Sequence, residues 1–161
     1  MTARDGRLRG KVAVVTGGGS GFGADIAKKL VEDGASVTVL DVDDAGGRRV
    51  ADEIDAASPG RARFVHCDVG VRSDVANAIR RILEADGRID AYVNNAGITH
   101  RNQPMLDVSE DWFDRIFTVN VKALYLSALE LVPVFRGQGG GGVIPIASTA
   151  GIRPRPGLTV Y

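Results

Sequence analysis

Short, largely apolar runs, the first of them the β-branched-rich Val12–Thr16, alternate with stretches in which apolar residues recur at helical spacing, along most of the chain. Nearly continuous apolar runs of this kind are typical of strands buried on both faces of a parallel sheet. The expected strands are Val12–Thr16, Ser36–Leu40, Ala62–Val65, Ala91–Val93 and Val143–Ala147. Because strands and helices alternate, we expect an α/β fold: a doubly wound parallel sheet of five strands in a three-layer α/β/α arrangement.

Capping residues indicate where the connecting helices begin and end. Side-chain oxygens of Asp and Ser accept hydrogen bonds from free N–H groups at a helix start. The expected N-caps are Asp43 or Asp44, Ser73 and Ser109. Gly34 is the expected stop of the first helix, and the glycine-rich stretch 137–142 is expected to break the chain after the last helix. Pro145, inside the fifth strand, lacks the N–H that one ladder bond would need if both edges of that strand were paired.

Composition excludes several classes of protein. The chain has 161 residues, of which 44% are apolar and 25% charged, as in one ordinary globular domain. Its 20 basic and 20 acidic residues give zero formal net charge, which disfavours binding to nucleic acid. The single cysteine, Cys67, has no partner for an internal disulfide, and we find neither a secretory signal nor a run approaching the roughly 18 apolar residues of a membrane helix. We expect a cytoplasmic protein without a membrane or nucleic-acid partner.

Glycine is over-represented, with 21 residues in 161, and it is concentrated in the stretch Gly17–Gly23 between the first strand and the first helix. Glycines there permit positive φ and bring the backbone close to a pyrophosphate, which the N–H groups of a helix start can hold. A loop for nucleoside triphosphates would end in Gly-Lys-Ser/Thr, whereas Gly23 precedes Ala24 and Asp25. We interpret the stretch as a dinucleotide cradle. A flexible turn is the alternative, since the spacing departs from GxGxxG.

Asp41 follows the second strand, and its position predicts contact with the ribose of a dinucleotide. It lies 24 positions after Gly17, close to the about 20 expected for the acid that hydrogen-bonds an adenosine ribose. A 2′-phosphate would meet the charge of this carboxylate, and neither Ser20 nor Val42 is a basic residue that would neutralise it. The residue pattern therefore favours NAD. The alternative is an acid that caps a helix or is simply solvated.

Six motifs in the same order resemble the short-chain dehydrogenase/reductase family in its compact form. They are Thr16–Gly23 for its TGxxxGxG loop, Asp68-Val69 for its adenine-contacting pair, Asn94–Gly97 for its NNAG, Asn120 for its mid-helix asparagine, Ser148 for its serine, and Tyr161 for its tyrosine thirteen residues later. The resemblance covers the chain from about residue 10 onward. It implies one dinucleotide-binding, Rossmann-type domain over residues 1–161, incomplete at the C-terminus.

The resemblance also implies a role for each matching residue. Tyr161 would be the acid/base, Ser148 would polarise the substrate oxygen, and Asn120 would hold a water that relays protons. The implied cofactor-binding residues are Gly17, Gly19, Ser20, Gly21, Phe22, Gly23, Asp41, Asp68, Val69, Asn95, Ala96 and Gly97. The implied activity is NAD-dependent hydride transfer between the cofactor and a small alcohol or carbonyl substrate, in a homodimer or homotetramer.

Other residues that could carry chemistry show no pattern of their own. His66, Cys67, His100 and Trp112 lack metal-ligand spacing, so we expect core or loop residues and no metal. Within the implied activity, a 3-oxoacyl thioester, a sugar or polyol, and another secondary alcohol all stay open as substrates.

One departure from the family motivates a second reading. The family's lysine would stand at position 165, four residues beyond Tyr161. A free tyrosine has a pKa of about 10 and needs a nearby cation to act as a base at neutral pH. If the polypeptide ends here, we expect a poor catalyst with an exposed sheet edge. The alternative function is therefore a noncatalytic NAD(H)-binding or regulatory module.

Overall fold

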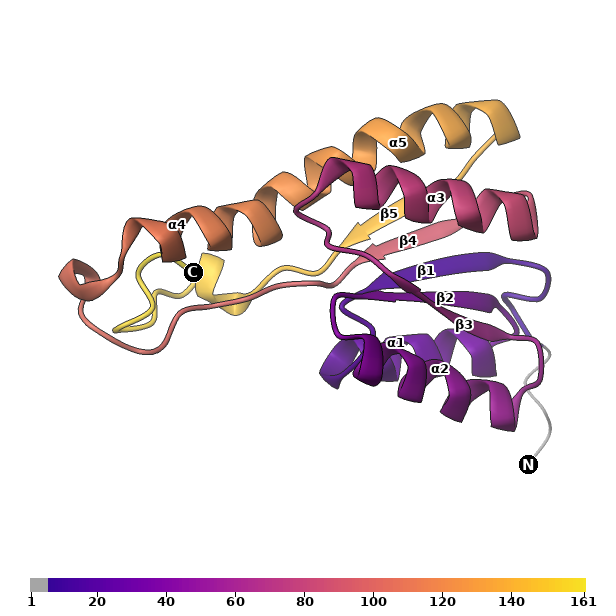
Figure 1. Cartoon of the computed structure of the whole chain (residues 1–161), viewed down its shortest axis with the longest axis horizontal. Coiled ribbons are helices and arrows are strands. Elements are labelled where there is room, and N and C mark those ends of the chain that lie inside the picture. Colours follow the sequence, from indigo (N-terminus) through magenta and orange to yellow (C-terminus); the bar gives the residue numbers. More distant parts are fainter. Residues whose placement is uncertain (1–5) are drawn as a thin grey trace.

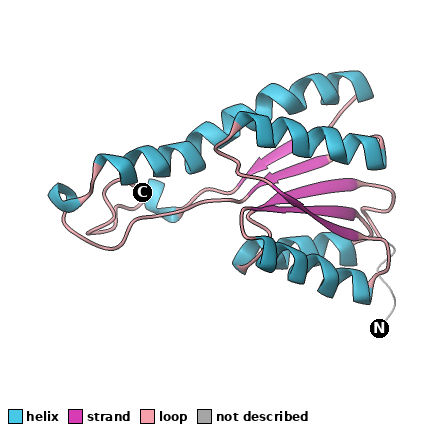
Figure 2. Ribbon diagram, viewed as in Figure 1, coloured by secondary structure: helices cyan, strands magenta, loops and turns pink. Residues whose placement is uncertain are grey.

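Five parallel strands with helices on both faces make up the protein, as a computed structural model of residues 6–161 shows (Figures 1 and 2). The strand order is β3-β2-β1-β4-β5. The strands are β1 (Val12–Thr16), β2 (Ser36–Asp41), β3 (Ala62–His66), β4 (Ala91–Asn94) and β5 (Gly142–Pro145). The helices are α1 (Gly21–Glu32), α2 (Asp44–Ala57), α3 (Arg72–Asp86), α4 (Glu110–Phe117) and α5 (Ala123–Gln138). The expected doubly wound α/β fold is confirmed.

The core lies in two layers, one on each face of the sheet. Successive side chains of a strand point to opposite faces, so β1 contributes to both layers. Val14 packs with residues of α3 and α5 on one face. Val15 packs with residues of α1 and α2 on the other face. This two-sided burial explains why β1 is a nearly continuous apolar run rather than an alternating one.

The chain reverses its direction across the sheet between β1 and β4. From β1 it proceeds through β2 to β3 at one edge, and it then crosses back so that β4 pairs with the other side of β1. At such a switch point the loops after two adjacent strands diverge and leave a crevice at the carboxyl ends of the strands. The glycine-rich stretch after β1 and the asparagine pair at the end of β4 therefore meet at this crevice.

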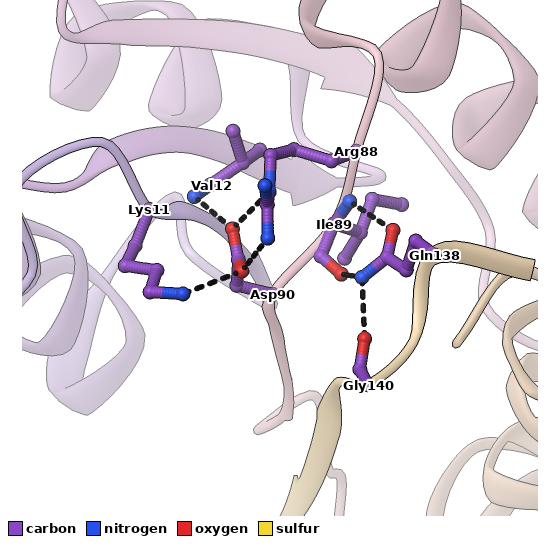
Figure 3. Close-up of polar contacts among 7 residues, drawn as sticks. All are labelled: Lys11, Val12, Arg88, Ile89, Asp90, Gln138 and Gly140. Carbon is purple, nitrogen blue, oxygen red and sulfur yellow. Dashed lines mark hydrogen bonds and ion pairs between the residues drawn. The ribbon is translucent and has the colours of Figure 1, made fainter. Parts of the chain in front are cut away.

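At the opposite, amino-terminal end of these strands, the Asp90 carboxylate joins β1 to the segment that leads into β4 (Figure 3). It accepts hydrogen bonds from the Val12 N–H at 3.0 Å, from Lys11 Nζ at 3.0 Å and from Arg88 Nη2 at 2.6 Å. Burial alone would raise the pKa of Asp90, but hydrogen bonds from Arg88, Val12 and Lys11 lower it to about 2. The carboxylate is thus held ionised at the base of the sheet.

Gln138, the last residue of α5, ties this helix to the same end of the sheet (Figure 3). Its Oε1 accepts the Ile89 N–H at 3.3 Å, and its Nε2 donates to the Ile89 carbonyl at 2.5 Å and to the Gly140 carbonyl at 2.6 Å. Gly139 follows in a left-handed conformation with φ of 82°. The helix therefore runs through Gly137, and the break falls at Gly139, within the expected stretch 137–142.

Two of the expected helix caps are confirmed and one is wrong. Asp43 accepts the Ala45 N–H, and Ser109 accepts the Trp112 N–H. Ser73 caps nothing, because α3 begins one residue earlier, at Arg72, with Val71 as its N-cap. The Val71 carbonyl accepts the N–H groups of Asp74 and Val75, so the helical hydrogen bonds already begin at Val71.

The fifth strand is shorter than expected, and its proline has an explanation. It spans Gly142–Pro145 instead of Val143–Ala147, and it pairs with β4 alone in the part of the chain that the structure describes. The Ile146 N–H bonds to the Asn94 carbonyl at 2.9 Å. Successive backbone nitrogens of a strand point to opposite sides. The nitrogen of Pro145 therefore points away from β4, toward the open edge, where no ladder bond is lost.

Helices α4 and α5 form one continuous helical stretch, joined by the π-helical turn Thr118–Lys122. By length and composition alone, the stretch Glu110–Gln138 could cross a membrane, although charged residues such as Lys122 and Glu130 interrupt its apolar run. Core helices of soluble proteins meet the same criterion. Here Leu131 of α5 is fully buried in the layer that α3 shares.

Candidate functional site

The loop between β1 and α1 turns tightly and lies against the start of the helix. Gly17 and Gly21 have backbone φ angles of 62° and 52°, which residues with a side chain rarely adopt. A Cβ on Gly23 would lie only 2.1 Å from the Gly17 carbonyl oxygen, so this close approach requires glycine. The N–H groups of the first turn of α1 are thereby brought to the crevice.

The start of α1 lacks the partners that the starts of α2 and α4 have. Its N-cap, Ser20, makes no side-chain capping bond, and its first turn contains no acidic residue. By contrast, α2 and α4 both have a side-chain cap and acidic residues in the first turn. An uncapped helix start, with free N–H groups and the positive end of the helix dipole, favours an anion.

Thr16 joins the glycine-rich loop to the asparagine pair after β4. Its Oγ1 accepts the N–H groups of Asn95 and Ala96, both at 3.0 Å, and it is 1% exposed. Asn95 Nδ2 in turn donates to the carbonyls of Thr16 at 2.9 Å and Gly17 at 3.2 Å. Thr16 therefore positions the neighbouring loop, a role that the sequence analysis did not assign. The sequence signal that could have revealed this role is a polar residue at the end of an apolar strand.

Asn94 and Asn120 connect this part of the chain to the helical stretch that contains α5 and the π-helical turn. Asn94 is buried and donates through Nδ2 to the hydroxyl of Ser127 on α5 at 3.2 Å. Asn120, in the π-helical turn, accepts the Ile98 N–H through Oδ1 and donates through Nδ2 to the Ile98 carbonyl, both at 2.9 Å. The side chain of Asn120 thus fixes the backbone immediately after Gly97. Ser127 had no sequence signal, since it is one hydroxyl in an apolar helix.

Asp41 lies at the carboxyl end of β2 and faces the glycine-rich loop. Its Oδ2 accepts the Gly19 N–H at 2.8 Å, and its Oδ1 accepts the Asp43 N–H at 3.0 Å. A carboxylate has about four lone-pair sites, so each oxygen keeps capacity to accept another hydrogen bond. The carboxylate is fixed in place and can still bind a pair of hydroxyls.

A cavity of about 750 Å³ extends along the carboxyl ends of the strands. Ten of the predicted cofactor-binding residues line it: Gly17, Ser20, Phe22, Gly23, Asp41, Asp68, Val69, Asn95, Ala96 and Gly97. Gly19 and Gly21 are not in its wall. Lining residues that the sequence analysis missed are Val42, Cys67, Gly70, Val71, Ile98, Asp114, Arg115, Thr118 and Val119. Those on α4 and the π-helical turn had no signal, because they reach the cavity only through the packing of the helix.

Beyond β3, Cys67 and Asp68 form part of the same wall. Cys67 is 1% exposed, and burial, together with the charges of Asp74 and Asp68, raises the pKa of its thiol to about 12. It therefore stays a neutral thiol and is no nucleophile. Asp68 accepts the Gly70 N–H at 2.8 Å, which holds the turn after β3 against the cavity.

The structure does not bring Ser148 and Tyr161 into the wall of this cavity. Ser148 is half-buried, and its hydroxyl accepts the Ala150 N–H at 3.1 Å. Tyr161 is 41% exposed and lines a second hollow of about 430 Å³ with Arg155 and Leu158. Asn120 is also not in the wall of the cavity, but its Oδ1 is 3.6 Å from where a Cβ on Gly97 would stand.

The residues set aside as core or loop lie in mixed environments. Cys67 and His100 are buried, as expected. His66 is exposed at the end of β3 and pairs with Asp44 at 2.7 Å, and Trp112 is 37% exposed on α4, so the interpretation is wrong for these two. Over residues 6–161, no group of three or more His, Cys, Asp or Glu side chains could hold a metal ion.

Known proteins are similar to this chain in sequence and in architecture. Residues 11–161 match the short chain dehydrogenase family. The 4-formylbenzenesulfonate dehydrogenase TsaC1/TsaC2 of Comamonas testosteroni is 47% identical over 96% of this chain and 61% of its own length. The crystal structure of 3-ketoacyl-(acyl-carrier-protein) reductase from Brucella melitensis complexed with NADH has a TM-score of 0.90 and 42% identity, over 96% of this chain and 63% of that one.

A third relative differs in the nucleotide that it holds. The crystal structure of a metagenomic short-chain oxidoreductase in complex with NADP has a TM-score of 0.89 and 37% identity, over 96% of this chain and 69% of that one. The chain spans about three fifths of the length of the curated relatives described above. With a family match over residues 11–161 and the same parallel sheet, this chain belongs to the short chain dehydrogenase family.

Proposed function

We propose that the protein binds NAD in the cavity at the carboxyl ends of the strands. The observation that carries this proposal is the uncapped start of α1, which borders the cavity beside the glycine-rich loop. The N–H groups of Gly21, Phe22 and Gly23 would hold the pyrophosphate. Asp41 would accept the hydroxyls of the adenosine ribose, and Asp68 and Val69 would contact the adenine. Residues 1–161 would form one domain for this purpose.

The preference for NAD over NADP rests on Asp41. Relatives of this chain have been crystallised with NADH and with NADP, so family membership alone does not decide the cofactor. The Asp41 carboxylate is oriented by two backbone N–H groups toward the loop. A 2′-phosphate there would bring like charges together, whereas a ribose hydroxyl would donate to the carboxylate.

The proposed reaction is hydride transfer between the nicotinamide and an alcohol or carbonyl carbon. The bound cofactor supplies the hydride acceptor or donor. The chain must then hold the substrate oxygen and move its proton, and these roles fall to Ser148 and Tyr161 through the spacing of the serine and tyrosine motifs. Asn120 would hold a relay water through the lone pair and N–H that its bonds to Ile98 leave free.

A second candidate is a noncatalytic NAD(H)-binding or regulatory module. It is favoured by the position of Tyr161, which lines a hollow separate from the cofactor cavity. Under the first proposal, the segment after β5 must bring Tyr161 to the mouth of the cavity when a substrate binds. Under the second, it need not do so.

The substrate is proposed only as a class. Two of the related proteins are named as a 4-formylbenzenesulfonate dehydrogenase and a 3-ketoacyl-(acyl-carrier-protein) reductase, so an aryl alcohol or aldehyde and a 3-oxoacyl thioester both fit the proposal. A sugar or polyol is the third class. We also propose a cytoplasmic homo-oligomer, a dimer or tetramer, without nucleic-acid or membrane partners.

The experiment is a fluorescence titration of the purified protein with NADH and with NADPH, followed by a turnover assay. Saturable binding that prefers NADH is expected, and circular dichroism on the same sample checks that the protein is folded. A folded protein that binds neither nucleotide would overturn the proposal. Reduction of NAD with any member of a panel of secondary alcohols supports the enzyme, whereas binding without turnover on the whole panel supports the second candidate.

A further inference from the structure

Gly19 lies between the Asp41 carboxylate and the first turn of α2. A Cβ on Gly19 would come within 2.9 Å of both Asp41 Oδ2 and the Gly47 nitrogen. A Cβ on Gly46 would lie 3.0 Å from the Gly19 carbonyl oxygen. Adjacent glycines in α2 therefore allow this helix to approach the loop closely. Asp41 and the first turn of α2 thus approach Gly19 from two sides, and Gly19 lies next to the cavity and not in its wall.

From this helix, Arg49 reaches the same residue that Asp41 holds. Its Nη2 donates to the Gly19 carbonyl at 3.2 Å, while Asp41 accepts the Gly19 N–H at 2.8 Å. A cation and an anion thus bind opposite ends of one glycine. Arg49 lies 30 residues after Gly19 in the chain. The residues next to Gly19 and Asp41 in the sequence, Ser20 and Val42, therefore give no sign of a basic residue at this site.

The guanidinium of Arg49 is held in place and keeps donors to spare. Nη1 donates to Glu53 at 2.9 Å, and Glu53 also pairs with Lys28 of α1 at 3.1 Å. The side chain of Arg49 is 57% exposed. A guanidinium has five N–H donors, of which these two contacts use two. Within the described residues, its ion pair is with Glu53 and not with Asp41.

We propose that Arg49 is a specificity-determining residue that donates to the 2′-phosphate of NADPH at the ribose end of the site. Asp41 opposes the 2′-phosphate, and Arg49 attracts it, so the preference between the two cofactors reflects both residues. Arg–phosphate hydrogen bonds are charge-assisted and directional, which suits this contact. The proposal rests on the proposed function, because it requires the ribose to lie at Asp41.

The neighbouring Arg48 offers a matched control. It carries the same charge one residue earlier in α2, but its guanidinium lies over the Phe64 ring, 5.4 Å from the ring centroid, and pairs with Asp44 at 3.8 Å. Loss of Arg48 changes the net charge near the site by the same amount as loss of Arg49. A difference between the two variants therefore reports the contact and not the overall charge.

The experiment measures the Kd values of NADH and NADPH by fluorescence titration, at low and high ionic strength, for Arg49→Ala and Arg48→Ala in two backgrounds. In Asp41→Ser, NADPH binding is expected to strengthen about tenfold or more, and adding Arg49→Ala should remove most of that gain, about five- to tenfold, while NADH changes less than about twofold. Adding Arg48→Ala should leave the gain in place. High salt should reduce the effect of Arg49.

The natural background gives an independent measurement if Asp41→Ser does not fold. There, Arg49→Ala is expected to raise the ratio of the NADPH Kd to the NADH Kd about threefold or more, and Arg48→Ala is expected to leave it unchanged. Equal weakening of both cofactors by Arg49→Ala would mean that it only positions the loop, and equal effects of the two variants would mean diffuse electrostatics. Either result overturns the inference while leaving the proposed function intact. If the folded natural protein binds neither nucleotide, the proposed function itself fails.

Discussion

Replacing Asp90 with Asn should destabilise the protein without affecting the cofactor cavity. Asp90 receives hydrogen bonds from Lys11, Arg88 and the Val12 N–H at the amino-terminal end of the sheet, and its side chain is 13% exposed. The cavity lies at the carboxyl ends of the same strands. The amide of Asn keeps the shape of the side chain but loses the charge that two cations share.

The size of the effect follows from the lowered pKa of Asp90, from an ordinary 3.8 to about 2. At about 1.4 kcal/mol per pKa unit, this change corresponds to about 2 kcal/mol of stability in favour of the ionised carboxylate. Because the pKa is lower in the folded protein than in the unfolded chain, the stabilisation is fully present above the unfolded value of 3.8. It is lost as the pH falls from about 4 through 2, and about half has gone at pH 3.

Urea unfolding followed by circular dichroism measures this difference. At pH 7 we expect Asp90→Asn to lower the free energy of unfolding by about 2 kcal/mol, and at pH 3 by about half as much. Asp52→Asn is the control, because Asp52 is exposed on α2 and forms no ion pair in the part of the chain that the structure describes. A difference below about 0.5 kcal/mol at pH 7, or one that does not shrink by pH 3, would refute the reasoning. The NADH Kd should stay unchanged.

Three further variants test the site itself. Gly23→Ala places a Cβ 2.1 Å from the Gly17 carbonyl oxygen and should abolish NADH binding, whereas Gly137→Ala, in open space on α5, should leave it unchanged in the same titration. Thr16→Val removes the hydroxyl that holds Asn95 and Ala96, and because the two N–H groups lose their acceptor we expect NADH affinity to fall about tenfold, measured by the same titration with the unfolding free energy alongside. Tyr161→Phe should abolish turnover of secondary alcohols while NADH affinity stays within about twofold, and retained turnover would contradict the acid/base assignment.

Strand positions could be predicted from sequence because the signal is local. Short, largely apolar runs placed the first four strands within a residue of where they lie, since buried strands of a parallel sheet favour such runs. The end of the fifth strand was misplaced because Ile146 and Ala147 continue the apolar pattern beyond Pro145, the last residue in register with β4, although the Ile146 N–H still bonds to the Asn94 carbonyl. Residues on an edge strand satisfy the apolar pattern without being paired, so periodicity alone does not mark the end of a ladder.

The residues on the cofactor side of the site could be predicted for the same reason. The side-chain contacts that support them could not be predicted from the sequence. The glycine-rich loop and Asp41 each follow directly from a strand that the pattern reveals. Arg49 and Ser127 reach their partners across 30 and 33 residues of sequence, through the packing of helices on opposite faces of the sheet. Spacing within the chain contains no trace of such contacts, because they depend on how far each helix lies from the sheet.

The two halves of the site rest on different amounts of packing, and this difference has a functional consequence. Thr16 and Asn94, which organise the cofactor side, are at most 6% exposed, in strands at the centre of the sheet. Every residue of β5, which leads to Ser148 and Tyr161, is exposed. The segment beyond it is held by contacts such as those of Asn102 with the Pro156 carbonyl and Gln103 with the Gly157 carbonyl. Cofactor binding should therefore survive changes around residues 145–161 that abolish turnover, whereas changes in β1 or β4 should reduce both together.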